Sequence, residues 1–441
     1  MIAKEKMRFF IRTFGCQMNV NDSEKVAGLL TARGHEPAPD AGRADFVFIN
    51  TCAVREKAAA KLYHSLARLR RAKKERPGLR IGVGGCVAQL EGAAVLEKAA
   101  HVDLLVGTHT LHRVPDLLDA TDGVVPRVDL DRRADAFAIP DTLVAHGSPV
   151  RAYVTVMEGC NHVCSFCVVP RTRGPEINRP PDDVVREVRS LVDRGYPEVM
   201  LLGQTVNAYQ ADGVDFPELL ARVHAVPGLE RLRFTTSHPE HVTLRLAEAL
   251  RDLDRLCPYL HLPVQSGSSR VLAGMRRGYD RRHYLDTVAL LRGHVPDLAL
   301  TSDVIVGHPG ETDEEFQETV SLVEEVGFDG LFVFKYSPRP GTTAARLADD
   351  VPEEEKSRRL HVLNEYQQRL QRRRNHARIG RREAVLVDAA EAPDRVSGRT
   401  PHFRIVHLEG ADPRLVGHTV VAEITGGGPN ALIGRVSQPI H

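Results

Sequence analysis

Six of the seven cysteines in this 441-residue chain fall into two sets whose spacing suits metal binding. The first set is Cys160, Cys164 and Cys167, which follow one another in the spacing CxxxCxxC. Thiolate sulfur is the soft ligand that iron–sulfur clusters take, and three thiolates can hold three irons of a [4Fe-4S] cluster. The fourth iron then has no ligand from this segment and can bind another molecule.

Zinc is an alternative ion for the same segment. A structural zinc site needs four ligands, which often come as two separated pairs. Only His162 is available nearby, and it lies between the cysteines at an awkward spacing. A third interpretation is a trio of free structural thiols. The spacing favours the iron–sulfur cluster, and a reducing compartment would keep the thiols free to bind it.

The second set is Cys16, Cys52 and Cys86, which lie at nearly equal intervals of one βα unit each. Each of them follows a strand-like run. Because the carboxyl ends of parallel strands meet at one edge of a sheet, the three thiols are expected to converge there. They would suit a second [4Fe-4S] cluster with one open iron. Three unrelated buried cysteines are the alternative.

The remaining cysteine and the overall composition narrow the class of protein. Cys257 has no partner at cluster spacing and is interpreted as a buried structural thiol. The net charge is only +1, so any nucleic-acid-binding surface must be local. No apolar run approaches about 18 residues, and the amino terminus lacks the apolar core of a signal peptide. We therefore expect a cytoplasmic protein that does not span a membrane.

Residues 7–120 have the pattern of an α/β domain with an open parallel sheet. The expected strands are Phe9–Ile11, Phe46–Ile49 and Ile81–Val83. One helical pattern opens at Asp22–Glu24, and a second runs through Leu62, Leu66 and Leu69. Residues 121–149 mix charge with proline and show no clear periodicity, so they are expected to form a linker.

From residue 150 to 375 the alternation of strands and helices resumes and predicts a partial (β/α)6 barrel. Its expected strands are Tyr153–Met157, Glu198–Leu202, Leu232–Thr235, Tyr259–Leu262, Leu298–Val306 and Gly330–Lys335. Helical patterns include Asp182–Arg194, Arg281–Arg292, Asp313–Glu325 and a last one from Pro352 to about Asn375. The CxxxCxxC segment follows the first strand, at the edge where barrel sites form.

Residues 376–441 change to short alternating strands, which predict a small OB-like β-barrel. The expected strands are Ala384–Val387, Phe403–Val406, Thr419–Ile424 and Ala431–Val436, broken at Ser397-Gly398 and at 426–429. Just before this module, the segment Lys356–Arg382 holds ten Lys or Arg residues and one acid, Glu365. Phosphate contacts would follow from such a charge, although a solvated helix face is the alternative.

The CxxxCxxC segment, with Phe166 before its last cysteine, resembles the radical S-adenosylmethionine (SAM) superfamily. The resemblance implies that the open iron binds the amino and carboxylate groups of SAM, and that electron transfer from the cluster yields a 5′-deoxyadenosyl radical. Loops at the other strand ends fit a SAM pocket, and ordinary βα turns are the alternative. The candidate contacts in these loops are Gly203, Gln204, Ser237, Gln265, Ser266, Gly307 and Gly310.

Nearly the whole chain resembles the radical SAM methylthiotransferase family. The resemblance rests on 13–19, 50–55, 85–89, 156–161, 168–174, 233–239 and 334–342, and on a carboxyl-terminal segment like the RNA-binding TRAM domain. It implies an α/β fold of radical SAM type, two [4Fe-4S] clusters and SAM as cofactors, and Cys16, Cys52, Cys86, Cys160, Cys164 and Cys167 as metal ligands. No side chain is assigned as catalytic.

Within the family, these sequence segments are most similar to those of the tRNA-2-methylthio-N6-dimethylallyladenosine synthase branch. That branch implies methylthiolation at carbon 2 of N6-dimethylallyladenosine next to the anticodon, with tRNA as partner, a reducing donor such as a flavodoxin, and an unknown sulfur donor. Two alternatives share the same chemistry: the ribosomal-protein aspartate branch and the branch that acts on threonylcarbamoyladenosine. An RNA-binding protein with a structural metal is the non-enzymatic alternative.

Overall fold

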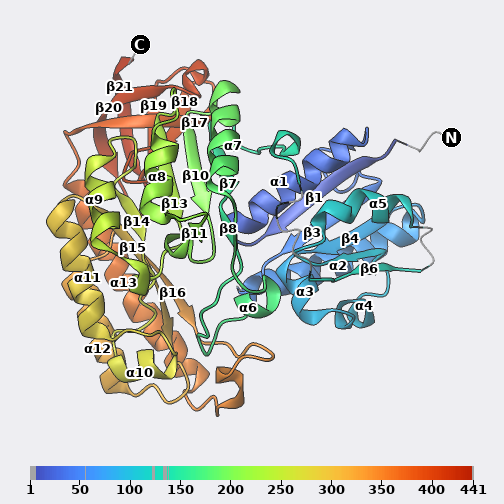
Figure 1. Ribbon diagram of the computed structural model, residues 1–441, viewed down its shortest axis with the longest axis horizontal. Coiled ribbons are helices and arrows are strands. Elements are labelled where there is room, and N and C mark those ends of the chain that lie inside the picture. The colour runs from blue at the N-terminus through green and yellow to red at the C-terminus, as the bar shows by residue number, and fades with distance from the viewer. Residues whose placement is uncertain (1–5, 55, 122–124, 133–136, 138, 440–441) are drawn as a thin grey trace. The chain divides into compact units, whose positions relative to one another are not determined.

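The computed structural model of the protein describes residues 6–54, 56–121, 125–132, 137 and 139–439 (Figure 1). The chain divides into two compact units. The first comprises Met1–Gly147, Met157–His162 and Cys167–Arg179, and the second comprises Ser148–Val156, Val163–Phe166 and Pro180–His441.

The first unit is built on a parallel sheet of six strands in the order β2-β1-β3-β4-β5-β6. The strands are β1 (Arg8–Phe14), β2 (Glu36–Pro37), β3 (Phe46–Thr51), β4 (Arg80–Gly84), β5 (Leu104–Val106) and β6 (Arg127–Asp129). The register pairs Phe14 with Thr51 and Asn50 with Gly84, so β1, β3 and β4 end at the same edge. The predicted open parallel sheet is therefore confirmed.

Helices cover both faces of this sheet, which explains why every residue of β3 is buried. The helices are α1 (Gln17–Ala32), α2 (Glu56–Glu75), α3 (Cys86–Glu91), α4 (Ala94–Lys98) and α5 (Val114–Asp119). Phe46 and Phe48 pack with apolar residues of α1 and α5. Val47 and Ile49 point the other way and pack with apolar residues of α2, α3 and α4.

One sequence-based expectation for this unit is wrong. Helix α1 begins at Gln17 rather than near Asp22, because Cys16 and the side chain of Asn19 cap its first turn. Within the expected linker 121–149, β6 pairs in parallel with β5 and a 3-10 turn spans Asp141–Leu143. Residues 122–124, 133–136 and 138 lie outside the described part of the chain, and the linker stays a prediction. The unit also contains β8 (Met157–Glu158), α6 (Val169–Thr172) and β9 (Ile177–Asn178).

The second unit contains the predicted partial barrel. Its strands are β7 (Arg151–Thr155), β10 (Glu198–Leu202), β13 (Arg231–Thr235), β14 (Tyr259–His261), β15 (Ala299–Val306) and β16 (Gly330–Lys335). They form two parallel sheets, β7-β10-β13 and β14-β15-β16, and a parallel bridge between Leu232 and Leu256 joins β13 to the segment before β14. All six predicted strands are confirmed.

Seven helices accompany these strands in the described part of the second unit (Figure 1). They are α7 (Pro181–Asp193), α8 (Phe216–His224), α9 (Leu244–Asp252), α10 (Ser269–Gly274), α11 (Arg281–His294), α12 (Asp313–Val326) and α13 (Glu353–His376). A short hairpin, β11 (Gln210–Ala211) with β12 (Val214–Asp215), precedes α8. Among the described residues, no helix is both long and apolar enough to cross a membrane.

The carboxyl-terminal module is a closed barrel in the order β17-β18-β19-β21-β20, as predicted. Its strands are β17 (Arg382–Ala392), β18 (Arg395–Arg399), β19 (Ile405–Glu409), β20 (Thr419–Gly427) and β21 (Leu432–Pro439). The expected break at Ser397-Gly398 is wrong, because both residues lie within β18. Gly398 is needed there, since a Cβ atom would lie 2.3 Å from the carbonyl oxygen of Leu386.

Within the second unit, a buried ionic cluster joins the small barrel to the partial barrel. Arg233 forms an ion pair with Glu198 at 2.9 Å and donates hydrogen bonds to the carbonyl oxygens of Thr400 and Pro401. Glu198 is 0% exposed and also pairs with Arg151. The ring of Phe403 lies beneath three guanidinium groups, those of Arg151, Arg233 and Arg399, at 5.3, 4.8 and 4.6 Å.

Candidate functional site

Cys16, Cys52 and Cys86 each follow the end of one of three neighbouring strands, β1, β3 and β4. The Cys16 and Cys52 thiols are hydrogen-bonded to each other. The backbone N–H of Cys52 donates to the carbonyl oxygen of Phe14, which ties the ends of β1 and β3 together at 2.8 Å. The sheet therefore gathers the second cysteine set at its carboxyl edge, as the intervals between the cysteines predict.

Two asparagines brace this edge. Asn19 accepts a hydrogen bond from the Cys16 thiol at 3.4 Å and donates to Asn50 at 3.3 Å. Asn50 in turn donates to the carbonyl oxygen of Asn19 at 2.9 Å. Gly85 has a φ of 86° and packs against Asn50, where a Cβ atom would lie 2.1 Å from the amide oxygen. Glycine lets the chain turn here directly before Cys86.

A buried arginine, Arg173, lies beside these thiols in the same unit. It forms an ion pair with Asp22, approaches Glu158 at 3.7 Å and hydrogen-bonds to the Cys86 sulfur. The hydrogen bond with Cys52 outweighs burial and, together with Asn19 and the charge of Arg173, lowers the pKa of Cys16 to about 6. Burial outweighs the same charge at Cys86 and raises its pKa. The edge therefore carries a thiol that ionises readily, next to a fixed positive charge.

Cys160, Cys164 and Cys167 lie in one irregular loop between β8 and α6, and each is half-buried. The N–H of Cys160 donates to the carbonyl oxygen of Gly174 at 3.2 Å. The Cys167 sulfur accepts from the N–H of Val169 at 3.4 Å. In the second unit, the Cys164 sulfur accepts from the guanidinium of Arg277 at 3.3 Å. N–H donors to sulfur favour the thiolate form that metal binding requires.

Hydrogen bonds between successive strand ends connect the loops that the sequence predicts to hold SAM. Gly203 donates to Thr235 at 3.3 Å, Ser237 to His261 at 3.2 Å, and Gln265 to Asp303 at 2.9 Å, all through the backbone. The predicted contact residues thus occur at the carboxyl ends of β10, β13, β14 and β15. Within the described residues, no group hydrogen-bonds to the buried Ser237 hydroxyl, which suits a ligand at this edge.

The other predicted contacts in these loops have partners inside the fold. Gln265 has a φ of 75° and bridges to Val304 through its backbone. The fully buried Ser266 hydroxyl lies 3.3 Å from that of Thr319 and accepts the N–H of Ser268 at 3.2 Å. These contacts shape the loop, and a direct contact of Ser266 with SAM stays a prediction. Gln204 follows Gly203 after β10 and is half-buried.

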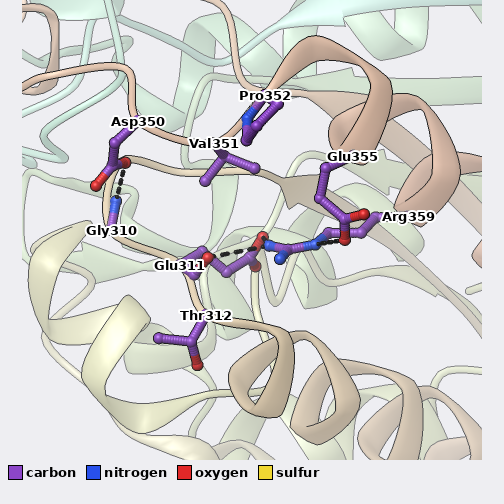
Figure 2. A pocket seen from close by; sticks show the side chains of 8 residues that line it. All are labelled: Gly310, Glu311, Thr312, Asp350, Val351, Pro352, Glu355 and Arg359. Atoms are coloured by element: carbon purple, nitrogen blue, oxygen red, sulfur yellow. Dashed lines mark hydrogen bonds and ion pairs between the residues drawn. The ribbon is translucent and has the colours of Figure 1, made fainter.

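The loop Gly307–Glu311 is fastened to α13. Glu311 accepts the N–H of Gly307 at 2.5 Å and pairs with Arg359 at 2.7 Å, and Arg359 also pairs with Glu355 (Figure 2). Burial raises the pKa of Glu311, although the hydrogen bonds from Gly307 and Arg359 act to lower it. A hollow of about 210 Å³ opens beside this group and includes Gly310, whose N–H donates to Asp350 at 2.7 Å. The loop is therefore held in place by its own unit.

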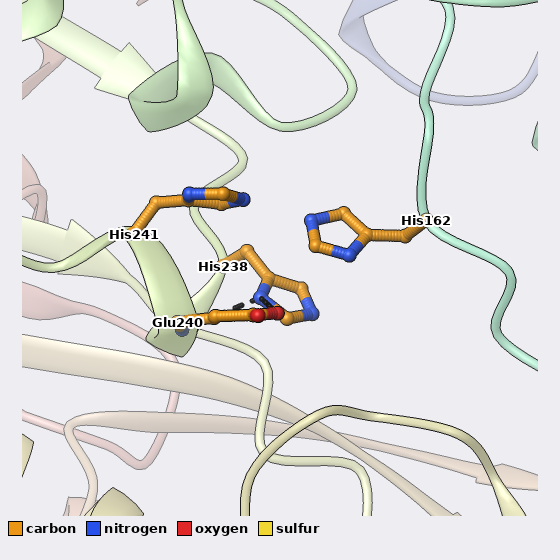
Figure 3. A group of neighbouring side chains, drawn as sticks. All are labelled: His162, His238, Glu240 and His241. Carbon is orange, nitrogen blue, oxygen red and sulfur yellow. Dashed lines mark hydrogen bonds and ion pairs between the residues drawn. The ribbon is translucent and has the colours of Figure 1, made fainter.

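His238 and His261 both lie at strand ends of the second unit and have polar partners there. The Nδ1 atom of His238 accepts the N–H of Glu240 at 3.3 Å, and its ring lies 5.8 Å from that of His241 (Figure 3). His261 contacts the Thr301 hydroxyl at 3.0 Å. These contacts hold both rings within their own unit.

The basic segment 356–382 is less free than its composition suggests. Lys356 and Arg359 are buried and ion-paired with Asp349 and Glu311. Further pairs are Arg358 with Asp313, Arg374 with Asp329 and Arg378 with Glu383. Besides the ion-paired Arg358, five arginines of the segment are exposed: Arg369, Arg372, Arg373, Arg381 and Arg382. The exposed charge therefore gathers near the start of the small barrel, and its contacts with phosphates stay a prediction.

Two family models match the chain: the radical SAM superfamily over residues 154–323 and the uncharacterized protein family UPF0004 over residues 8–107. The chain is 46% identical to the tRNA-2-methylthio-N6-dimethylallyladenosine synthase of Bordetella bronchiseptica, over 98% of this chain and 92% of the relative. The enzymes of that name from Bordetella pertussis and Neisseria gonorrhoeae are 47% and 46% identical, over 97% of this chain and 98% and 99% of theirs. The chain belongs to this synthase family.

Solved structures support the fold at much lower sequence identity. The radical SAM methyltransferase TsrM from Kitasatospora setae is 15% identical with a TM-score of 0.55, over 77% of this chain and 75% of that one. The cobalamin-dependent radical SAM enzyme OxsB is 10% identical with a TM-score of 0.53, over 82% and 56%. These likenesses confirm a radical SAM type of architecture.

Sequence reasoning did not assign two of the residues that contact the thiols. Arg173 lies in the segment 168–174 that carries the family resemblance, and its ion pair with Asp22 spans 151 residues. Arg277 lies 113 residues from Cys164, and no periodicity or spacing singles it out. The segment Arg276-Arg277-Gly278 has the composition of an exposed polar turn, and only the structure shows that Arg277 is buried.

Proposed function

We propose that this protein is a radical SAM methylthiotransferase that adds a methylthio group to carbon 2 of N6-dimethylallyladenosine next to the anticodon of tRNA, giving 2-methylthio-N6-dimethylallyladenosine. The observation that carries the proposal is the set of Cys16, Cys52 and Cys86 at one sheet edge, in a chain that shares 46% identity with synthases of that name over 98% of its length.

The donor groups fit two [4Fe-4S] clusters and SAM. Three thiols at one sheet edge, and three more in one loop, each give a set that leaves an iron open. When bound, the loop cluster and SAM would supply the radical chemistry, and the edge cluster would supply the sulfur. The SAM contacts that we propose are Gly203, Gln204, Ser237, Gln265, Ser266, Gly307 and Gly310. Among them, the Ser237 hydroxyl has no hydrogen-bond partner in the described residues, which supports Ser237 in particular.

The chain's own residues position these groups. Asn19 accepts a hydrogen bond from the Cys16 thiol, and Asn50 at the end of β3 holds Asn19 in place. Arg173 places a permanent positive charge beside the thiols, which favours their ionised form. Burial of the edge excludes water, which strengthens each of these interactions.

Exposed arginines near the small barrel support contacts with the tRNA backbone. Arg381 and Arg382 lie at the start of β17, and Arg372 and Arg373 lie in the last turns of α13. Guanidinium groups bind phosphates without reading sequence. These residues would therefore orient the RNA, while the strand ends of the partial barrel would select the base. We further propose a cytoplasmic location and a low-potential one-electron donor such as a flavodoxin.

The test is a nucleoside analysis of tRNA from a strain without the gene. Mass spectrometry should show loss of 2-methylthio-N6-dimethylallyladenosine and accumulation of N6-dimethylallyladenosine, and the wild-type gene should restore the product. The variant Cys52→Ser should not restore it, whereas the matched control Cys257→Ser should, because Cys257 is a buried thiol outside both sets. Loss of the methylthio group from threonylcarbamoyladenosine in tRNA, or from an aspartate of a ribosomal protein, would support one of the alternative branches instead.

A further inference from the structure

Arg277 is a buried cation whose guanidinium contacts the radical SAM cysteine loop. Its side chain lies in the turn between α10 and α11 and is 6% exposed. The group donates to the Cys164 sulfur at 3.3 Å, to the Tyr279 hydroxyl at 3.0 Å and to the carbonyl oxygen of Pro263 at 3.2 Å. Its three bonds thus join a cysteine of the loop to the loop that follows β14.

The positive charge of Arg277 has no carboxylate beside it to neutralise it in the described part of the fold. Among the described residues, it forms no ion pair with a carboxylate, and a buried charge without a counter-charge is costly. Arginine stays protonated in proteins, so it cannot escape this cost by losing its proton. Burial opposes the charge, but Tyr279 and the Cys164 sulfur outweigh it and raise the pKa of Arg277. The natural counter-charge is the thiolate and what the thiolate binds.

We propose that Arg277 is a positioning residue that raises the reduction potential of the cluster held by Cys160, Cys164 and Cys167. This inference rests on the proposed function, because it takes that cluster as given. Reduction transfers one electron to the cluster from an external one-electron donor, which is oxidised by one electron, and no bond forms or breaks. A fixed positive charge and an N–H···S hydrogen bond both stabilise the form with more negative charge.

A purely structural role predicts a different pattern. The Tyr279 hydroxyl lies 3.2 Å from the carbonyl oxygen of Pro263 and 3.0 Å from that of Val264, so the loop after β14 has a second support. Loss of Arg277 should therefore leave this loop largely in place. The bond to Cys164 has no such substitute in the described part of the second unit, so its loss should appear at the cluster.

The test is a redox titration of the full chain followed by electron paramagnetic resonance. Cys16, Cys52 and Cys86 are replaced by alanine, so that only the loop cluster remains. In this background we compare Arg277→Met, Arg277→Gln and Arg277→Lys. Arg276→Met is the matched control, because Arg276 is the preceding arginine and is exposed. Iron content of each sample is measured first.

Arg277→Met should lower the ratio of reduced to oxidised cluster at least tenfold at a fixed potential, which is 59 mV for one electron. Arg277→Lys should retain most of the wild-type potential, and Arg276→Met should retain all of it. If Arg277→Met does not hold its iron, Arg277→Gln decides, because it keeps an N–H donor without the charge. A potential equal to the control in the loaded variant would refute the inference. Absence of any cluster in the parent background would instead refute the proposed function.

Discussion

Replacing Glu198 by glutamine should destabilise the second unit more than any exposed carboxylate replacement. Glu198 is 0% exposed and lies between Arg151 and Arg233, so the change removes the charge that both guanidinium groups face. Breaking a buried ion pair costs about 3–5 kcal/mol. Arg151 keeps a contact with Asp388 at 3.6 Å and Arg233 keeps two carbonyl acceptors, so we expect the lower end of that range.

A loss of about 3 kcal/mol corresponds to a fall in melting temperature of about 6–12 °C for a unit of this size. The assay is thermal unfolding of the cluster-loaded protein under anaerobic conditions near neutral pH, followed by circular dichroism. The matched control is Glu218→Gln, because Glu218 pairs with Arg222 on the solvent-exposed face of α8. That pair is worth about 0.3–0.5 kcal/mol, so the control should shift the midpoint by about 1–2 °C.

The pH dependence follows from the same charges. Burial opposes ionisation of Glu198, but Arg233 and Arg151 outweigh it and lower the pKa of its carboxyl. The stabilisation is therefore fully present when the pH is above the pKa of the carboxyl in the unfolded chain, about 4.3. It is lost as the pH falls through the lower pKa of the folded state. The difference between wild type and variant should stay constant from pH 6 to 8. Equal melting temperatures for the Glu198 and Glu218 variants would refute this account of the cluster.

Three further outcomes follow from the thiols and the exposed arginines. Cys52→Ser should lower the iron content of the reconstituted enzyme from about eight to about four per chain, measured by iron assay, and an unchanged content would argue against an edge cluster. In the cluster-free protein, Cys16 should be alkylated half-maximally near pH 6, because its pKa is lowered to about 6, while buried Cys257 should react slowly at that pH; mass spectrometry of the labelled peptides compares them. Replacing Arg381 and Arg382 by alanine should reduce the slope of tRNA affinity against salt by about two, and an unchanged slope would place the RNA elsewhere.

The sequence predicts the fold best where apolar runs are long. All six strands of the partial barrel could be located from such runs, and four of them, β7, β10, β13 and β15, are buried along most of their length. β6 escaped detection, since its three residues lie among charges at the edge of the sheet. β18 was interpreted as a break because Gly398 is a common turn residue, whereas here it relieves a close approach to Leu386.

The candidate site divides in the same way. The intervals between Cys16, Cys52 and Cys86 indicate a shared edge, because strand ends are set by topology alone. Arg173 and Arg277 could not be assigned in this way, since their bonds to sulfur depend on how distant segments pack. The start of α1 at Gln17 was missed for a related reason, as the cap depends on side-chain geometry at Cys16.

The packing of Phe403 limits what domain deletion can reveal. Its ring contacts guanidinium groups of β7 and β13 and lies 5.0 Å from the ring of Tyr259 in β14. A chain truncated before β17 would therefore lose the Phe403 ring that packs beneath those strands, and Glu198 with its arginines would be exposed to water. Weak activity of such a fragment would report damage to the catalytic half as much as loss of RNA affinity. Point substitutions on the outer surface of the small barrel separate the two effects.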